Sequence, residues 1–371
     1  AITMSDMSSY TNEHSMESYF GRANYNYADK YYLSASIRTD ASSKFHPDNR
    51  RGTFWSVGGS WRLTQEEWLK DVEWLSDLKL KASYGTQGND GILDAYGDLV
   101  YQPYLQQYAI SNNNGQFSVV ETYRGNKDLT WEKSKNLNVG VESGFFHNRL
   151  KFEMEYFLKK TSDMLYNMPY PISSGISYIP MNLLDMKNQG VEFTISGTPV
   201  QTADFVWNVS FNGTHYRNKI VSLPEEKRKE GIIHGKSSLF RLTEGGSIYD
   251  VYTYEYAGVN PENGAAQWYK NELDENGNII GRTVTEDYNQ ADKYDLGTTL
   301  PDFQGGFSMD FSYKNFDLSV ATNFQIGGQL YDSMYSNFMH AGSDMGSNWH
   351  NDILNAWTPE NTNTDVPIMD G

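Results

Sequence analysis

The feature that most constrains the fold is an alternation of apolar and polar residues over long stretches of the chain. From Leu150 to Leu158 every second residue is apolar, and Lys151, Glu153 and Glu155 lie between them. The same period of two recurs at 33–38, 191–196, 205–212 and 307–313. Successive side chains of a strand point to opposite faces, so the pattern predicts strands with one apolar and one polar face. The longer runs approach the roughly 9–11 residues that a tilted strand needs to cross a bilayer, whereas sandwich strands usually have about 5–6.

The connections between these runs alternate in length. Short links occur at 28–30, 147–149, 201–204 and 314–315, and long ones at 42–52, 88–130, 162–187, 224–246 and from 327 onward. Outer-membrane barrels have this asymmetry, with tight periplasmic turns and long external loops. The loops of a β-sandwich lie at both of its ends and have no reason to alternate. We therefore expect an all-β protein of the cell outer membrane, built as an antiparallel transmembrane β-barrel.

Two regions are expected to depart from plain strands. Segment 64–77 predicts one short periplasmic helix, because Thr64 and Glu67 form a capping box ahead of an apolar face. Segment 249–300 predicts two strands joined by a long outer loop. The expected total is about twelve strands, and the polar end at Gly371 lacks a final strand. Residues 1–371 are therefore expected to be a partial outer-membrane β-barrel domain, belonging to the roughly 22-stranded class whose lumen is plugged.

The composition agrees with strands that have one polar, water-facing side and one apolar side. Mean hydropathy is −0.64, yet 15% of the 371 residues are aromatic, as in barrels whose interfaces carry aromatic girdles. No apolar run of about 18 residues exists, which excludes transmembrane helices. The net charge of −17 argues against nucleic-acid binding. The absence of cysteine excludes thiolate metal sites.

Several segments, in order along nearly the whole chain, carry a likeness to a known family. They are 22–27, 30–33, 38–45, 54–62, 78–89, 129–132 (Leu129-Thr130-Trp131-Glu132), 138–140, 156–165, 188–192 and 301–306. In these segments the chain resembles the SusC/RagA family of TonB-dependent transporters. The ordered likeness along the chain is much more specific than any one of the motifs.

The resemblance implies a Bacteroidetes-type outer-membrane importer of large nutrients, either oligosaccharides or peptides. The implied partners are a SusD-like surface lipoprotein that closes the barrel mouth as a lid, the TonB complex, the lipid bilayer with its lipopolysaccharide, and the cargo. A homodimer of the transporter–lid pair is a further implied assembly. The chain departs from the family in having no TonB box, plug domain or final strands. TonB coupling is thus expected through a missing N-terminal region.

Catalytic chemistry has little support, and we expect no enzyme activity, no catalytic residues, no cofactor and no metal site. The seven histidines never fall at metal-ligand spacing, and no phosphate loop or nucleophile elbow is present. Glu153 and Glu155 would share one strand face about 6–7 Å apart, but a wet lumen face explains them without glycosidase chemistry. Turn formation similarly explains the Asp274–Asn278 cluster, which lacks the glutamate of a calcium loop.

Aromatic residues of the long loops are the candidate contacts for the ligand or the lid, because sugars bind to aromatic faces. The candidates in the terminal loop are Tyr331, Tyr335, Trp349 and Trp357, and those after Gly88 are Tyr101 and Tyr104, with Tyr96 and Tyr108 as similar residues. The alternative is that they pack the loops together or belong to an interfacial girdle.

Three other functions remain open from the sequence. A TonB-dependent siderophore or cobalamin receptor would carry a smaller cargo, which needs less aromatic loop surface. A soluble carbohydrate-binding β protein would dissolve without detergent and have loops at both ends. A passive porin would have neither plug nor TonB box.

Overall fold

The computed structural model describes residues 11–93, 98–113, 115–234, 239–340 and 346–369. It divides into two compact units. Unit 1 consists of Ala1–Lys229 and Phe303–Gln325, and unit 2 consists of Glu230–Asp302 and Ile326–Gly371. Unit 2 is thus formed by the segment inserted before strand β18 (Phe303–Tyr313) and by the segment that follows strand β19 (Phe316–Ile326).

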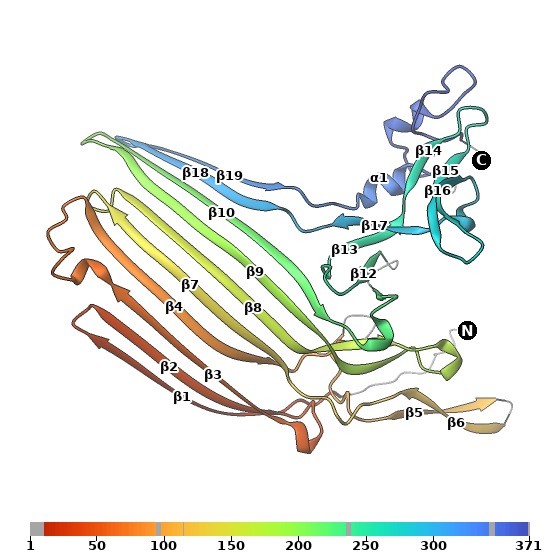
Figure 1. The fold of residues 1–371 in the computed structure, drawn as a ribbon, viewed down its shortest axis with the longest axis horizontal. Helices are drawn as coiled ribbons and strands as arrows, with labels where there is room; N and C mark the ends of the chain where they lie inside the picture. Colours follow the sequence, from red (N-terminus) through yellow and green to blue (C-terminus); the bar gives the residue numbers. More distant parts are fainter. Residues whose placement is uncertain (1–10, 94–97, 114, 235–238, 341–345, 370–371) are drawn as a thin grey trace, which may run out of the picture. The chain divides into compact units, whose positions relative to one another are not determined.

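Unit 1 is built on one long antiparallel sheet, which confirms the predicted all-β class (Figure 1). Its ten strands, in spatial order, are β1 (Met16–Tyr27), β2 (Tyr31–Ser42), β3 (Arg51–Arg62), β4 (Leu75–Asn89), β7 (Glu132–Phe145), β8 (Leu150–Pro169), β9 (Tyr178–Gln201), β10 (Phe205–Ser222), β18 (Phe303–Tyr313) and β19 (Phe316–Ile326). Neighbours in this order are also neighbours in the sequence, apart from insertions between β4 and β7 and between β10 and β18. A plain up-and-down meander of this kind is the wall of a transmembrane barrel.

The strand register separates a polar face from an apolar face. One row of directly paired residues crosses nine strands on the polar face: Asn26, Tyr32, Ser60, Lys81, Gly140, Glu155, Glu192, Thr214 and Gln304. The next row lies on the opposite face and contains Tyr25, Leu33, Gly59, Ala82, Val139, Tyr156 and Val191. Because lumen-facing and lipid-facing residues alternate in a barrel strand, the first row defines the luminal face and the second the outward face.

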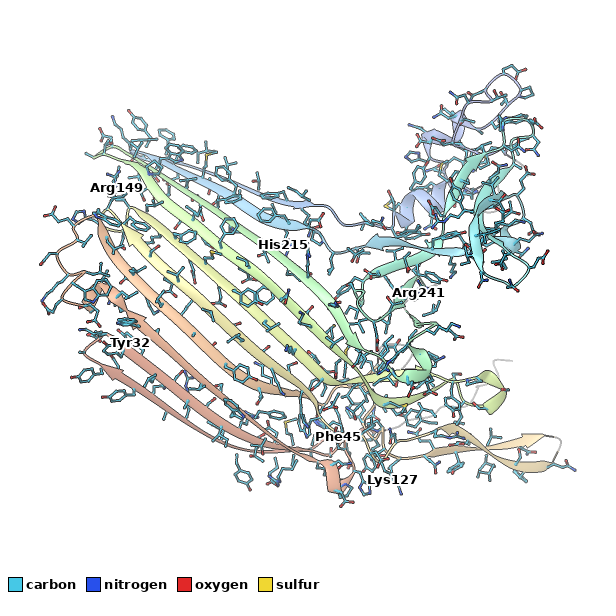
Figure 2. The ribbon with its side chains drawn as sticks, in the orientation of Figure 1. Tyr32, Phe45, Lys127, Arg149, His215 and Arg241 are labelled. Atoms are coloured by element: carbon cyan, nitrogen blue, oxygen red, sulfur yellow. The ribbon has the colours of Figure 1, made fainter. Side chains whose placement is uncertain are left out.

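The ends of the sheet differ as the sequence predicts. Short turns join β1 to β2, β7 to β8, β9 to β10 and β18 to β19, and Figure 2 places Arg149 at this end. Ala28 and Asp29 both have positive φ, the backbone that a tight hairpin with right-handed strand twist requires. The long connections leave the other end, where Phe45 and Lys127 lie (Figure 2).

The long loop predicted at 162–187 is wrong in extent. Strand β8 continues to Pro169 and β9 begins at Tyr178, so the connection is only 170–177 and contains the 3-10 helix Ile172–Ser174. A register shift between Thr161 and Met164 interrupts the alternation there, and Asp163 takes a positive φ. Such a bulge hides the period of two although the two strands stay paired.

The helix predicted at 64–77 is also wrong. Only the 3-10 helix Leu63–Gln65 forms, followed by turns. Thr64 donates its hydroxyl proton to Asp77 at 3.0 Å instead of capping a helix. Glu66 accepts hydrogen bonds from Lys30, Tyr31 and Trp61, at 3.1, 2.7 and 3.0 Å. These contacts with unit 1 strands replace the helical hydrogen bonds that the local pattern favours.

The prediction that segment 249–300 supplies two wall strands is wrong, because this segment adds no strand to the ten-stranded sheet. It forms β13 (Asp250–Tyr254), β14 (Tyr256–Val259), β15 (Ala266–Leu273), β16 (Ile279–Thr285) and β17 (Lys293–Thr298). Together with β11 (Ile232–His234) and β12 (Phe240–Leu242) they make a four-stranded and a three-stranded sheet in unit 2. The expected total of about twelve wall strands is therefore ten in the described residues. A short helix, α1 (Ser333–Phe338), completes unit 2, and no helix of the described ranges is long and apolar enough to cross a membrane.

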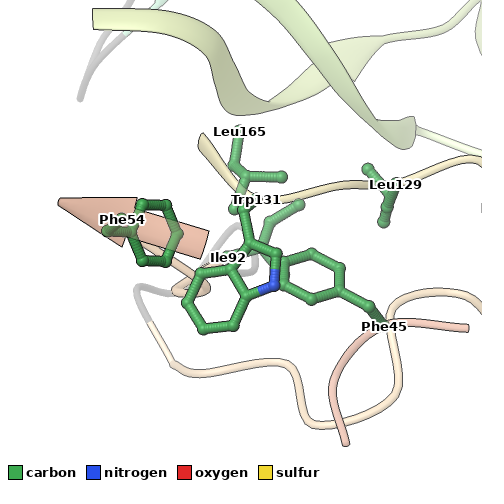
Figure 3. Packing of buried hydrophobic residues seen from close by; sticks show 6 residues of the cluster. All are labelled: Phe45, Phe54, Ile92, Leu129, Trp131 and Leu165. Carbon is green, nitrogen blue, oxygen red and sulfur yellow. The ribbon is translucent and has the colours of Figure 1, made fainter. Parts of the chain in front are cut away.

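A small apolar core holds the connections at the long-loop end of unit 1 (Figure 3). It consists of Phe45, Phe54, Ile92, Leu129, Trp131 and Leu165, none more than 9% exposed. The indole Nε1 of Trp131 donates to the carbonyl of Arg50 at 2.8 Å. Gly88 lies beside this core, where a Cβ would come within 2.0 Å of Phe54. The core therefore fixes the connection 43–50 against the sheet, together with the two ends of the next connection, at Ile92 and at Leu129–Trp131.

Candidate cargo-facing site

A cluster of charged residues lies on the luminal face, where β4, β7 and β8 run side by side (Figure 1). The ammonium group of Lys81 lies 3.1 Å from Glu142, 2.6 Å from Glu153 and 3.2 Å from Glu155. Lys79 also binds Glu142, at 3.2 Å. The register explains the cluster, because Glu142 lies opposite Glu153 and Gly140 leaves room for the Lys81 side chain.

The same face continues as a hollow across β4 to β18, where most lining side chains are polar and Phe157, Leu158 and Tyr216 add apolar surface. Its lining includes Gln87, Asn138, Glu155, Glu192, Thr214 and Gln304. Amide, hydroxyl and carboxylate groups of this kind can exchange hydrogen bonds with a polar solute. Glu153 and Glu155 both bind Lys81, so the two carboxylates share one environment. A catalytic acid and base need environments that separate their pKa values, so this pair is part of a charged wall.

A second polar group ties the long connections together. Ser42 donates to the carboxylate of Asp90 at 2.6 Å, and Lys44 binds the same carboxylate at 3.4 Å. His14 Nε2 lies 3.5 Å from Asp90. The Lys44 side chain is only 7% exposed, so its charge is compensated inside the loops. This group positions the loops.

The four aromatic candidates of the terminal loop all lie in unit 2 and divide into exposed and packed residues. Tyr331 and Trp349 are 64% and 55% exposed. Tyr335 is 39% exposed and meets the ring of His350 edge-on at 4.9 Å. Trp357 is half-buried and donates to the carbonyl of Pro261 at 3.2 Å. Tyr331 and Trp349 are thus available to a ligand, whereas Trp357 holds the turn at 260–264.

The candidates that follow Gly88 lie in unit 1. Tyr104 is half-buried and meets the ring of His46 edge-on at 5.9 Å, and Tyr101 is half-buried as well. Tyr108 is 58% exposed on the hairpin of β5 (Gln107–Asn113) and β6 (Gln116–Tyr123). Tyr96 lies outside the described residues. Among the candidates that the structure describes, no ring contact joins Tyr101, Tyr104 and Tyr108 into one aromatic platform.

Sequence reasoning missed a set of cation–aromatic contacts in unit 2. The guanidinium of Arg241 lies 4.0 Å from the ring centre of Tyr252, and that of Arg282 lies 3.9 Å from the ring centre of Tyr294. Arg241 also binds Asp295, and Arg282 binds Glu255 at 2.9 Å. No local spacing signals these contacts, because each joins residues more than ten positions apart.

Ionisable groups in unit 2 are shifted by their surroundings. Burial raises the pKa of Asp250, and the nearby Asp295 charge adds to the effect. Hydrogen bonds from the side chain and backbone of Asn278 hold the pKa of Asp274 below its usual range. The Asp274 carboxylate therefore accepts hydrogen bonds within the turn 274–278, as the sequence predicts. Among the described residues no three histidine or acidic side chains are close enough together to hold a metal ion.

The meander, the two-faced strands and the polar luminal wall define the class of protein: an outer-membrane β-barrel receptor. Residues 2–235 match the family model described as TonB dependent receptor-like, beta-barrel. The chain belongs to this family, and it is therefore an outer-membrane protein.

Comparison with individual relatives shows which members of the family the chain resembles. The chain is 35% identical to TonB-dependent receptor P3 of Formosa agariphila over 99% of its own length and 37% of that protein. It is 29% identical to TonB-dependent receptor SusC of Bacteroides thetaiotaomicron, over 90% of this chain and 33% of that one. The solved structure of the RagAB peptide transporter matches with a TM-score of 0.79 and 30% identity, over 95% of this chain and 38% of that one. The resemblance to the SusC/RagA type is confirmed, and the chain spans 33–38% of the length of these relatives.

Proposed function

We propose that the protein containing this chain imports large polar nutrients, oligosaccharides or peptides, through the outer membrane with energy supplied by TonB. The likeness to SusC and to the RagAB peptide transporter along nearly the whole chain carries this proposal. These relatives are named as receptors and transporters, which fits a protein without enzyme activity.

The luminal face supports a polar cargo. Its row of paired residues is almost free of apolar side chains, and the charged cluster around Lys81 lies in the middle of the wall. Along such a wall, hydrogen bonds to the protein can replace those that a polar solute loses to water. This property suits a glycan or a peptide backbone equally.

A SusD-like surface lipoprotein is the proposed partner and lid. The long connections would form the mouth that it covers, with Tyr331 and Trp349 as exposed aromatic contacts for the lid or the cargo. Aromatic residues of this kind supply much of the binding energy at protein interfaces and stack on sugar rings.

The test uses the full-length transporter in its own bacterium. Deletion of its gene is expected to abolish growth on one polymeric nutrient, glycan or protein, and to spare growth on the corresponding monomer. Deletion of TonB is expected to have the same effect, and a tagged transporter is expected to co-purify with a surface lipoprotein. Undiminished uptake of both glycans and peptides in the deletion strain would rule the proposal out.

A further inference from the structure

The outward face of unit 1 carries an unusual row of like charges. Lys135 on β7, Lys160 on β8, Lys187 on β9 and Lys219 on β10 are directly paired from strand to strand. Directly opposite residues of neighbouring strands have Cβ atoms only about 4.5–5.5 Å apart, and like charges in these positions are destabilising. The arrangement therefore needs a source of negative charge to offset it.

The described residues of the chain do not provide that charge. No acidic side chain of the described residues pairs with any of the four lysines. Two acidic residues, Asp163 and Asp185, lie beyond the row, toward the long connections. There Asp163 lies 3.9 Å from Lys133, and Asp185 accepts hydrogen bonds from the Asp163 amide and the Ser222 hydroxyl. Lys135, Lys160 and Lys219 are exposed and Lys187 is half-buried, so their ammonium groups face the surroundings of the barrel.

The position of the row along the strands identifies these surroundings. Each lysine lies ten residues from the row Phe145, Leu150, Gly197 and Val209, which marks the short-turn end. Ten residues rise about 33 Å along a strand, or about 25 Å along the membrane normal at a tilt of about 40°. That height equals the apolar band of an outer-membrane barrel, so the lysines lie at the outer headgroup level.

Aromatic residues support the same two boundaries. At the lower level Phe145 stacks on Trp74 with ring centres 6.0 Å apart, and Trp207 stacks on Phe311 at 5.7 Å. At the upper level Thr86, paired with Lys135, accepts a hydrogen bond from the backbone of Trp55, which is 44% exposed. Tryptophan is enriched at membrane interfaces, where its ring reaches both apolar and polar surroundings.

We propose that the row Lys135, Lys160, Lys187 and Lys219 binds the phosphate groups of the phosphorylated glycolipid in the outer leaflet. The sugars of that lipid join its acyl chains directly and carry its phosphates, so the phosphates lie immediately above the hydrocarbon. Lysine binds phosphate as a point charge, and its methylene chain can lie along the apolar band below. The proposal depends on the outer-membrane location of the chain and not on the identity of the cargo.

The experiment compares the full-length transporter with its double variant Lys160→Gln/Lys187→Gln in phosphatidylcholine nanodiscs. The probe is purified bisphosphorylated lipid A, and retained lipid is measured by mass spectrometry. Because each lysine near an anionic surface contributes about five-fold to affinity, the variant is expected to bind about thirty-fold more weakly. Lys160→Arg/Lys187→Arg keeps the charges and is expected to bind as the wild type does.

The matched control is Lys159→Gln/Lys70→Gln. Lys159 is adjacent to Lys160 but lies on the luminal face, and Lys70 lies in the connection at the short-turn end. This control variant is expected to bind lipid A as tightly as the wild type does. Heat-modifiable electrophoretic mobility checks that every variant is an assembled barrel.

Three results would overturn the proposal: equal retention of lipid A by the wild type and the glutamine variant, equal binding of fully dephosphorylated lipid A, or displacement by inorganic phosphate alone at similar concentration. Retention is measured without cargo, TonB or lipoprotein, so its failure leaves the proposed import function untouched. A failure of import would in turn leave the lipid result unchanged.

Discussion

Lys81 illustrates how one residue organises the luminal wall, since it is the only cation within 4 Å of Glu153 and Glu155 among the described residues. Replacement by Met would leave Glu153 and Glu155 without a cation partner, close to Glu142, which would keep only Lys79. We expect Lys81→Met to lower the free energy of unfolding by about 1–2 kcal/mol, between the values typical of exposed and buried ion pairs. Denaturant unfolding of the full-length protein in detergent measures this change.

Adding Glu153→Gln to Lys81→Met should recover part of the loss, because it removes one of the repelling charges. Lys151→Met, at an exposed position on the luminal face of β8, is the control and is expected to change stability by less than about 0.5 kcal/mol. Equal losses in the two lysine variants would contradict the role assigned to the cluster.

Glu66 provides a pH-dependent contact at the short-turn end. Hydrogen bonds from Tyr31, then Trp61 and Lys30, hold the pKa of Glu66 below its usual range. A carboxylate with a depressed pKa stabilises the fold fully above the ordinary glutamate pKa of about 4.3, and this stabilisation is lost as the pH falls through the depressed value. We therefore expect the connection 63–74 to open on acidification below about pH 4 while the strands stay protected. Hydrogen exchange of the amides of 63–74, compared at pH 6 and pH 3.5, measures this opening.

Glu66→Gln is expected to make the protection of 63–74 nearly independent of pH in this range. Glu67→Gln is the matched control, because the Glu67 side chain is 85% exposed and forms an ion pair with Lys70 at 3.6 Å, away from the Glu66 contacts. A pH response that survives in Glu66→Gln would assign the effect to another group.

At the scale of elements, the structure changes the interpretation of 162–187 from a loop to the end of a paired hairpin. Met168 pairs with Ile179 and Leu165 with Asn182, beyond the bulge at Asp163. We expect amides of 164–169 and 178–184 to exchange slowly with solvent, and those of 171–176 to exchange quickly. Mass spectrometry of peptic fragments tests this, and rapid uniform exchange over 162–187 would favour the loop.

The strands of unit 1 are predictable from the sequence because their two environments, lipid and lumen, are imposed on every second residue. The failures have specific physical causes. The bulge at Asp163 hides the period of two, and the contacts of Glu66 override the capping box at Thr64. Segment 249–300 contains strand-like runs, but periodicity cannot say which sheet a strand joins. The Lys81 cluster and the lysine row depend on register across strands, which no single stretch of sequence displays.

At the scale of the whole molecule, the aromatic candidates of unit 2 combine two roles that alanine substitution can separate. Trp357 lies against Gly264, where a Cβ would come within 2.6 Å of the indole, and it binds Pro261. Trp357→Ala is expected to destabilise unit 2 by about 2 kcal/mol, since it removes a half-buried ring and a hydrogen bond. Any loss of cargo or lid binding in this variant would then accompany a loss of folding.

Tyr331→Ala and Trp349→Ala should act in the opposite way. Both rings are more than half exposed, so unfolding should change by less than about 0.5 kcal/mol. If they contact the lid or the cargo, lipoprotein affinity or uptake by the full-length transporter should fall by about ten-fold or more, as for aromatic residues at an interface centre. Calorimetric titration of the lipoprotein and uptake of labelled cargo measure the two functions, and Tyr256→Phe, which removes only a hydroxyl bonded to the Asp365 carbonyl at 3.0 Å, is the control. Unchanged affinity and uptake in both exposed variants would mean that the lid and the cargo contact other surfaces. The charged luminal cluster around Lys81 would then be the next candidate for the cargo contact.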